Sequence, residues 1–386
     1  MHVVHVYGSF DPREGGPPAV VAGLAWGLRA AGHAVTLVSG DLADAPAVDA
    51  FLGTHLVPLP PRLSVRPRLP HKLDPAAGPL RALLKTADVL HVHGVWPPAG
   101  LLATQVATES GLPWVLTPHG MLHREALHQK RLKKLFGLYA LGYRRVISDA
   151  AVLHVLNDDE RRLAVGPRRP ARIVEIPNGI FPDEFVDLPE RGAFRASVPG
   201  LADAPFVLSL ARLHLQKGPD LLLEAFASLS ERFPGVHLVF AGPDQGAGPG
   251  LRAEAERRGL SNRVHLPGPR FGRARLEALV DAAVFCLPSR QEGFSMAITE
   301  ALAAGLPAVV SDACHFPQVE SAGCGRVTSL RPSDLAAGLA EVLDQVLDHP
   351  DAARELGMRG QALVAQAYTW PRIGERMVAL YTEVRR

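Results

Sequence analysis

The alternation of short apolar runs with amphipathic helical stretches constrains the fold of this chain more than any other feature. Such alternation is typical of parallel sheets covered by helices on both faces. The predicted strands are 2–7, 34–39, 88–92, 113–117, 151–155, 172–176, 206–211, 236–241, 263–266, 283–287 and 307–310. The predicted helices are 18–31, 98–110, 122–148, 158–164, 218–232, 250–259, 273–281, 294–304, 333–348 and 351–366.

The length of the chain indicates two domains, because 386 residues are too many for one ordinary core. Residues 178–205 are rich in proline and glycine and carry scattered charges, which predicts a linker. We therefore expect an α/β protein with two doubly wound, Rossmann-like domains, 1–185 and 186–366, that face a central cleft. Residues 367–386 form a final helix, and whether it packs back on the first domain stays open. Ligands of such sheets bind beyond the carboxyl ends of the strands.

Composition excludes several classes of protein. The formal net charge is +2, so a polybasic nucleic-acid-binding protein is not expected. The three cysteines form no C-x-x-C pair, which argues against a zinc ribbon or a disulfide scaffold and fits a reducing compartment. The first residues form a strand pattern without the features of a signal peptide, so we expect a cytoplasmic location, extending to the inner face of the membrane.

The segment "RQEGFSMAITEALAAGLP", residues 290–307, carries two glutamates beside a helix start. Gly293 predicts a turn, and the N–H groups at the start of the following helix have no internal partner, which suits a diphosphate. Glu300 leans back towards that start and can accept hydrogen bonds from a ribose, whereas Glu292 can reach a second set of hydroxyls. The alternative stays open that Glu300 serves helix propensity and Glu292 is a solvated loop residue.

Two cations follow the first strand of the second half, in "LSLARLHLQKGPDLLLEAF". Arg212 and Lys217 both emerge where that strand ends, so they can neutralise a leaving diphosphate. The alternative is a pair of ordinary surface cations. The absence of a D-x-D motif predicts that no metal holds the diphosphate here.

Several segments together resemble a known family. "ARLHLQKG", "AGPD", "LPGPRFG", "PSRQEGFSMAITEALAAGLP" and "SDACHFPQVESAGCG", preceded by "REGGPPAVV", "TPHGML" and "PNGI", look like the retaining glycosyltransferases of the GT-B fold, family 4. The resemblance covers nearly the whole chain. It implies transfer of a sugar from a nucleotide diphosphate, UDP or GDP, to a saccharide or lipid-linked hydroxyl, in cell-surface polysaccharide or glycolipid assembly and without a cofactor.

The resemblance also implies roles for matching positions. Glu292 and His119 would contact the transferred sugar, Glu300 the ribose, and Arg212 and Lys217 the diphosphate. The implied catalytic residues are His119, Arg212, Lys217 and Glu292. The implied donor-binding residues are Gly15, Gly16, Gly242, Phe271, Gly293, Phe294, Ser295, Met296, Ala297 and Glu300.

The sequence leaves two interpretations open for each of two further features. His91 and His93 share one face of a strand, as metal ligands might, but the sequence shows no third ligand, and the alternative is polar residues at a strand end. The basic stretch 127–145 predicts either a solvated face or contact with anionic lipid. Rival functions are a sugar-nucleotide 2-epimerase and a non-catalytic sugar-nucleotide-binding protein. A nicotinamide oxidoreductase is disfavoured because Leu251 breaks the glycine fingerprint at 246–251.

Overall fold

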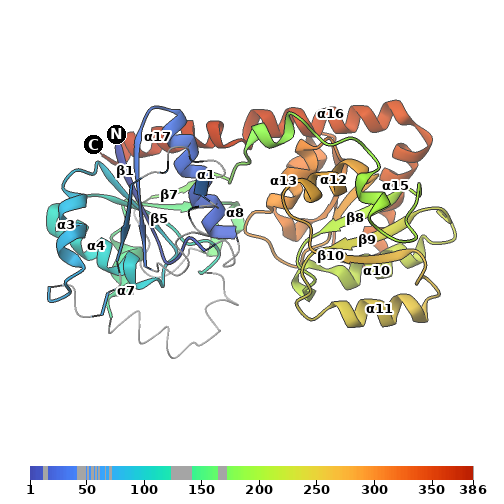
Figure 1. Ribbon diagram of the computed structural model, residues 1–386, viewed down its shortest axis with the longest axis horizontal. Helices are drawn as coiled ribbons and strands as arrows, with labels where there is room; N and C mark the ends of the chain where they lie inside the picture. Colours follow the sequence, from blue (N-terminus) through green and yellow to red (C-terminus); the bar gives the residue numbers. More distant parts are fainter. Residues whose placement is uncertain are drawn as a thin grey trace. The chain divides into compact units, whose positions relative to one another are not determined.

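The computed structural model describes most of the chain, and it divides into two compact units. The first unit is Met1–Gly179 with Thr369–Arg386, and the second unit is Ile180–Tyr368 (Figure 1). The boundary therefore falls a few residues before the predicted one at 185/186. The described residues are 1–11, 16–40, 49, 52–53, 56, 59, 61–65, 67–68, 72–122, 141–163 and 172–385.

The first unit is built on a parallel seven-stranded sheet in the order β3-β2-β1-β4-β5-β6-β7. The order reverses between β1 and β4, which are hydrogen-bonded neighbours, so this is its topological switch point. The strands are β1 (His2–Tyr7), β2 (Ala34–Ser39), β3 (Arg62–Ser64), β4 (Val89–His93), β5 (Trp114–Thr117), β6 (Val152–Val155) and β7 (Ile173–Glu175). The helices are α1 (Gly16–Ala30), α3 (Ala77–Leu84), α4 (Pro98–Ser110), α7 (Tyr143–Ser148), α8 (Asp158–Leu163) and α17 (Trp370–Val384).

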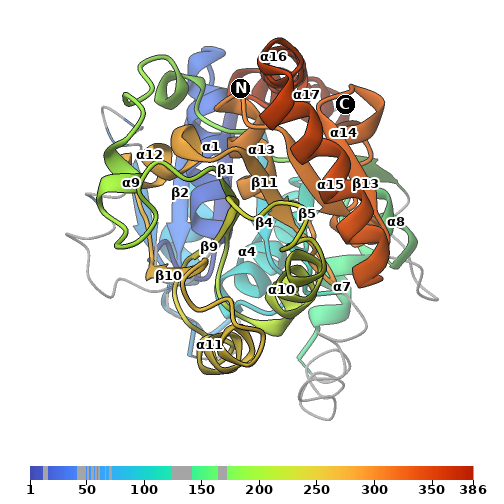
Figure 2. The same cartoon turned by 90° about the vertical axis from the view of Figure 1, so that its right-hand side faces the viewer.

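The second unit is built on a parallel six-stranded sheet in the order β10-β9-β8-β11-β12-β13, with its switch point between β8 and β11. One face packs on α9, α12, α13, α14 and α16, and the other on α10, α11 and α15. Figure 2 shows α15 beside β13. The strands are β8 (Phe206–Leu210), β9 (His237–Ala241), β10 (Val264–Gly268), β11 (Val284–Leu287), β12 (Ala308–Ser311) and β13 (Gly325–Thr328). The helices are α9 (Ala193–Ala196), α10 (Pro219–Ser228), α11 (Gly248–Arg257), α12 (Arg273–Asp281), α13 (Met296–Ala303), α14 (Gln318–Ser321), α15 (Pro332–Asp348) and α16 (Pro350–Ala367), with 3₁₀ turns η2 (Pro182–Phe185), η3 (Leu215–Lys217) and η4 (Asp312–Cys314).

The final helix, α17, belongs to the first unit and packs on α1, as Figure 1 shows. The contact is close because glycines stand where the helices meet. A Cβ on Gly23 would lie 1.9 Å from the indole of Trp370, and one on Gly27 would lie 2.4 Å from the carbonyl oxygen of Trp370. Trp370 itself is 1% exposed. Thus the first unit is assembled from two separate stretches of chain.

The two units divide between Gly179 and Ile180, inside the predicted break at 178–205, but the rest of that segment is not a linker. Phe194 and Leu201 are buried in the core of the second unit, and α9 lies within the same stretch. A linker contacts little, whereas these side chains contribute to a core. Among the described residues the prediction also missed β3, α3, α14 and β13. Of the predicted helix 122–148, residues 123–140 lie outside the described residues, as does most of the basic stretch 127–145.

Candidate active site

The loops that follow β8 and β11 meet at the switch point of the second unit. Gly218 has φ 67°, and a Cβ there would lie 2.0 Å from the carbonyl oxygen of Pro288. Glycine therefore allows the two loops to touch, and the N–H of Arg290 donates to the carbonyl oxygen of Gln216 across 2.7 Å. This contact brings the end of η3 beside the start of the β11–α13 loop.

Lys217 and Glu292 form an ion pair in these loops. Lys217 Nζ donates to Glu292 Oε1 across 2.5 Å, and Ser289 Oγ donates to the same oxygen across 2.6 Å. The Glu292 side chain is 8% exposed, so Glu292 is not a solvated loop residue. Burying an ion pair contributes little net stability, because desolvation offsets the attraction. The arrangement instead holds a cation and a carboxylate together at a place where such sheets bind ligands.

Arg212 follows the same strand as Lys217 but has a different partner. Its guanidinium is exposed and donates to Gln245 Oε1 across 2.8 Å. Nearby, a Cβ on Gly242 would lie 1.9 Å from the carbonyl oxygen of Ala211, so this glycine lets the ends of β8 and β9 approach. The structure thus gives Gly242 a packing role, whatever its role towards a ligand.

Helix α13 begins at Met296, close to the start of the predicted helix 294–304. Ser295 caps it, since Ser295 Oγ accepts a hydrogen bond from the N–H of Ile298 across 3.4 Å. The Phe294 ring packs against the rings of Phe316 and Tyr368, which fixes the direction of the Gly293 turn. The first turn of α13, which contains Ala297, thus follows Glu292 after a short turn in the chain.

Glu300 is bonded to an arginine that the sequence analysis missed. Arg275 Nη1 donates to Glu300 Oε1 across 2.8 Å, and Arg275 Nη2 donates to Glu184. Burial raises the pKa of Glu300 to about 7, against the opposing effect of Arg275 and with a smaller contribution from Glu184. Arg275 lies on a correctly predicted helix and Glu184 in the predicted linker, so no local signal connected them. Phe271 is 74% exposed.

In the first unit, His119 follows β5 with φ 50°, in the left-handed region that few side chains adopt. Glu160 anchors the adjoining turn, because its Oε1 accepts a hydrogen bond from the N–H of Gly120 across 2.8 Å. Gly16 is the exposed first residue of α1, and Gly15 lies outside the described residues.

The histidines of β4 have a third neighbour, which the sequence analysis did not find. Nitrogens of His5, His91 and His93 lie within 4.8 Å of one another, and all three side chains are buried. The sheet register explains why His5 lies near the other two, since His5 on β1 is the register partner of His91 on β4. His93 does end β4, whereas His5 and His91 lie inside their strands, and all three rings are buried. Most of their nitrogens already make hydrogen bonds.

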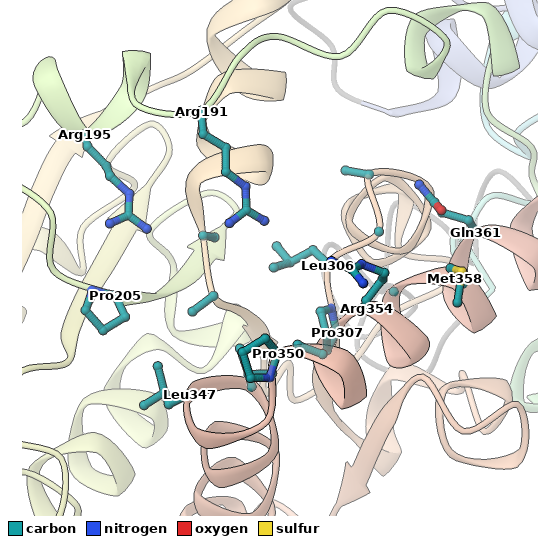
Figure 3. Close-up of a pocket in the computed structure, with 17 residues that line it drawn as sticks. Arg191, Arg195, Pro205, Leu306, Pro307, Leu347, Pro350, Arg354, Met358 and Gln361 are labelled. Atoms are coloured by element: carbon teal, nitrogen blue, oxygen red, sulfur yellow. The ribbon is translucent and has the colours of Figure 1, made fainter.

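A cavity of about 590 Å³ lies elsewhere in the second unit (Figure 3). Pro205, Ala283 and Pro307 line it, and each precedes a strand, so the cavity lies at the amino ends of β8, β11 and β12. Lys217 and Glu292 lie at the carboxyl ends. The cavity is therefore separate from the candidate active site.

Within the described residues, every helix is too short or too polar to span a bilayer.

Comparisons with known proteins point to one family. Residues 191–362 match the family model "Glycosyl transferases group 1", and residues 15–179 match "Glycosyl transferase 4-like domain". The phosphatidyl-myo-inositol mannosyltransferase of Mycobacterium tuberculosis is 30% identical, over 97% of this chain and 95% of its own length. The GDP-mannose:cellobiosyl-diphosphopolyprenol alpha-mannosyltransferase of Komagataeibacter xylinus is 27% identical, over 100% of this chain and 93% of its own length.

Solved structures agree over the full chain. Anabaena HepE in complex with UDP and glucose aligns with a TM-score of 0.74 and 18% identity, over 99% of this chain and 100% of its own. WaaG, a glycosyltransferase involved in lipopolysaccharide biosynthesis, aligns with a TM-score of 0.65 and 20% identity, over 99% of this chain and 100% of its own. At these identities the likeness concerns the fold.

Proposed function

We propose that this chain, which belongs to the group 1 glycosyl transferases and has the GT-B fold, moves a hexose from a nucleoside diphosphate to a hydroxyl of a lipid-linked acceptor with retention of the anomeric configuration. That the chain is a glycosyltransferase follows from its family and from relatives named mannosyltransferases along its whole length. The donor, the acceptor and the stereochemistry are the proposal.

The observation that carries the proposal is the buried Lys217–Glu292 pair at the switch point of the second unit. A nucleoside diphosphate sugar presents negative phosphates next to sugar hydroxyls. An ammonium beside a carboxylate matches that sequence of groups, since the ammonium can bind phosphate and the carboxylate can accept hydroxyl hydrogen bonds. Arg212 adds a second cation after the same strand.

Our proposed reaction needs no metal. The bond between the sugar's anomeric carbon and the phosphate oxygen breaks, and the acceptor oxygen bonds to the same carbon from the same face. The acceptor's proton passes to the departing phosphate oxygen. Charge that gathers on the phosphate is stabilised by Lys217 and Arg212, and such preorganised stabilisation is a large part of many enzymes' rate.

The relatives guide the choice of substrates. One is named a phosphatidyl-myo-inositol mannosyltransferase, and another takes GDP-mannose and a cellobiosyl-diphosphopolyprenol. HepE binds UDP-glucose in a solved structure. We therefore propose GDP-mannose as the first donor to test, with UDP-glucose second, and a lipid carrying a free hydroxyl on its head group as the acceptor.

The experiment measures release of nucleoside diphosphate from each donor, with and without phosphatidylinositol or a polyprenyl diphosphate saccharide. Mass spectrometry identifies the product, and NMR coupling constants give its anomeric configuration. We expect acceptor-dependent release with retention, and loss of release in Glu292→Gln but not in the matched control Glu320→Gln on the exposed surface. An inverted product would refute the stereochemistry. Conversion of the donor's sugar into its 2-epimer without any acceptor would favour the 2-epimerase.

A further inference from the structure

A row of buried histidines crosses the sheet of the first unit. His5 lies on β1, His91 and His93 on β4, and His154 on β6. All are at most 1% exposed. Side chains alternate along a strand, and the strand residues next to these histidines belong to the core that packs on α3 and α4. The histidines therefore face the other side of the sheet, where α17 contributes Tyr381. Burial lowers the pKa of each imidazole, to about 3 for His5, so the rings are neutral at pH 7. A neutral ring has one N–H donor and one acceptor nitrogen.

Along one chain of hydrogen bonds, a backbone carbonyl determines which nitrogen of each ring carries the hydrogen. Ile176 O can only accept, so His154 Nε2, 2.7 Å away, carries a hydrogen and His154 Nδ1 is an acceptor. Thr117 Oγ1, 2.7 Å from that nitrogen, must donate to it. His91 Nε2 then donates to Thr117 Oγ1 across 2.7 Å, and Tyr381 donates to His91 Nδ1 across 2.5 Å. Every member of this chain is satisfied in one arrangement.

A second chain leads to the candidate sugar-binding histidine. His5 Nδ1 lies 2.9 Å from His93 Nε2, and His93 Nδ1 lies 3.0 Å from His119 Nε2. The stacked rings of His93 and His119 have centroids 5.2 Å apart. Among the described residues no carbonyl bonds to these three rings, so two arrangements are possible. Either each histidine donates towards His119, or each donates towards His5.

The far end of the chain decides between the two arrangements. His5 Nε2 is buried and has no hydrogen-bond partner among the described residues. In one arrangement it is an unpaired N–H, and in the other it is an unpaired acceptor. Orphaned buried N–H groups are rare in proteins, more so than acceptors that lack a partner. The arrangement in which His5 Nδ1 donates to His93, and His93 Nδ1 donates to His119, is therefore favoured.

We propose that His93 and His5 are positioning residues that hold His119 in the form with its hydrogen on Nδ1, so that His119 donates a hydrogen bond to an oxygen of the transferred sugar. This rests on the proposed function for the contact with sugar, but the hydrogen's place on His119 does not. His119 Nε2 is occupied by His93, which leaves Nδ1 for a ligand. The left-handed backbone at His119 and the Glu160 anchor at Gly120 hold the ring in that direction.

The first test is NMR of ring nitrogens in the wild-type protein labelled with ¹⁵N-histidine. His119 is assigned through its loss in His119→Gln. We expect a pyrrole-type shift for His119 Nδ1 and a pyridine-type shift for Nε2, at pH 7 and without ligand. The opposite pattern would overturn the proposal, regardless of enzyme activity. A stoichiometric metal ion in the purified protein that shifts the His5, His91 and His93 nitrogens would also overturn it, because the ion would break the chain.

The second test uses variants of His93 that differ in one property. His93→Leu removes the donor to His119, whereas His93→Gln keeps an amide donor. We expect His93→Leu to lower kcat about ten-fold with KM for the donor within about two-fold, and His93→Gln to recover most of the rate. His265→Gln is the matched control, since His237 and His265 form a similar pair 2.9 Å apart in the second unit. Equal losses in both folded His93 variants, or an unchanged His119 nitrogen spectrum in His93→Leu, would refute the positioning role. If activity is absent in the wild type, the NMR result still decides the inference.

Discussion

Arg275 Nη1 donates to Glu300 Oε1 across 2.8 Å and joins the start of α12 to the middle of α13. The same guanidinium contacts Glu184, so two carboxylates share one cation in the second unit. A ribose that binds Glu300 must therefore share the carboxylate with Arg275 or displace it. The carboxylate that the family resemblance assigns to the ribose is thus already bonded to an arginine of the protein.

The Glu300 contact predicts a pH-dependent affinity for the nucleotide. The pKa of Glu300 is raised to about 7, so its carboxylate is ionised above that pH and protonated below it. Because an ionised acceptor makes stronger bonds to hydroxyls, worth roughly 1.5–3 kcal/mol, we expect affinity for a nucleoside diphosphate sugar to rise as pH increases through about 7. Calorimetry at about pH 6, 7 and 8 measures it. Glu300→Gln should bind more weakly at high pH and show no such rise; parallel pH curves for both proteins would contradict the assignment.

Lys217 and Arg212 are predicted to act on the rate. As the donor bond breaks, charge grows on the leaving phosphate, so a cation aimed there gains energy mainly in the transition state. We expect Lys217→Ala and Arg212→Ala each to lower kcat on the order of 10²–10³-fold, more than either raises KM. Lys217→Arg should restore only part of the rate, since a planar fork does not replace an ammonium.

The matched control for these cations is Arg326→Ala. Arg326 also pairs with a carboxylate, Glu341, but on the exposed surface, where such pairs contribute at most about 1 kcal/mol. Melting curves check that each variant is folded, because Lys217→Ala removes the cation that pairs with the buried carboxylate of Glu292. Alanine variants that keep kcat within a few-fold of wild type would exclude the leaving-group role.

Metal removal should leave turnover unchanged. The sequence has no D-x-D motif, and two cations follow β8 where a phosphate is proposed to bind. We expect the initial rate after treatment with excess EDTA and desalting to equal the untreated rate. A loss that added magnesium or manganese reverses would show that a metal takes part.

Acid should destabilise the first unit. Burial lowers the pKa values of His5, His91, His93, His119 and His154 below their ordinary 6.5, so the folded state binds fewer protons than the unfolded state below that pH. Their contribution to the stability of the folded state is thus complete above about pH 6.5 and is lost as pH falls below it. Glu300 acts in the opposite direction between its ordinary pKa and about 7, but it is one group in the other unit.

Tryptophan fluorescence reports selectively on the unfolding of the first unit. All four tryptophans lie at 26, 96, 114 and 370, within the first unit. Urea unfolding followed at about pH 7.5, 6.5 and 5.5 should show a steep loss of stability, shallower in His154→Asn. Replacement of the exposed His349 by glutamine should leave the slope as in wild type. A flat profile would mean that the buried rings accept protons without unfolding.

The glycines of α1 that contact α17 are predicted not to tolerate substitution by a larger residue. A Cβ on Gly27 meets a backbone carbonyl that no rotamer change can move, so we expect Gly27→Ala to lower the free energy of unfolding by about 1–3 kcal/mol. Gly250→Ala is the control, because this helical glycine of α11 has open space around it and alanine favours a helix. Denaturant unfolding of both variants tests the contact. Equal unfolding midpoints for Gly27→Ala and Gly250→Ala would show that α1 and α17 can move apart without loss of stability.

Apolar runs predicted most of the strands, because buried parallel strands such as β8 and β11 consist almost entirely of apolar residues. The missed strand β13 reads "GRVT" and has no such run. Its place is set by pairing with β12, which a local pattern does not contain. The burial of Phe194 and Leu201 was missed for a similar reason. Apolar residues scattered among prolines and charges resemble a linker in the sequence, and only the folded structure shows that they pack into a core.

The candidate site was predictable in its residue types but not in its pairings. Lys217 and Glu292 were both singled out, yet 75 residues separate them, and their contact arises from strand order. Arg275 gave no signal of its own on an amphipathic helix. His5 joined His91 and His93 only through the register of β1 on β4.

The division of the first unit into two stretches has a consequence for synthesis on the ribosome. The nascent chain exposes residues 1–179 first, but the partner of Gly23, Gly27 and His91 on α17 is translated after the whole of 180–368. The later unit is continuous and can fold as soon as it emerges. The earlier unit must wait, and until α17 arrives the face of α1 that packs on Trp370 is uncovered and His91 Nδ1 lacks its bond from Tyr381, so both are open to chaperones and proteases. Premature termination before α17 would therefore damage the half of the protein that was made first.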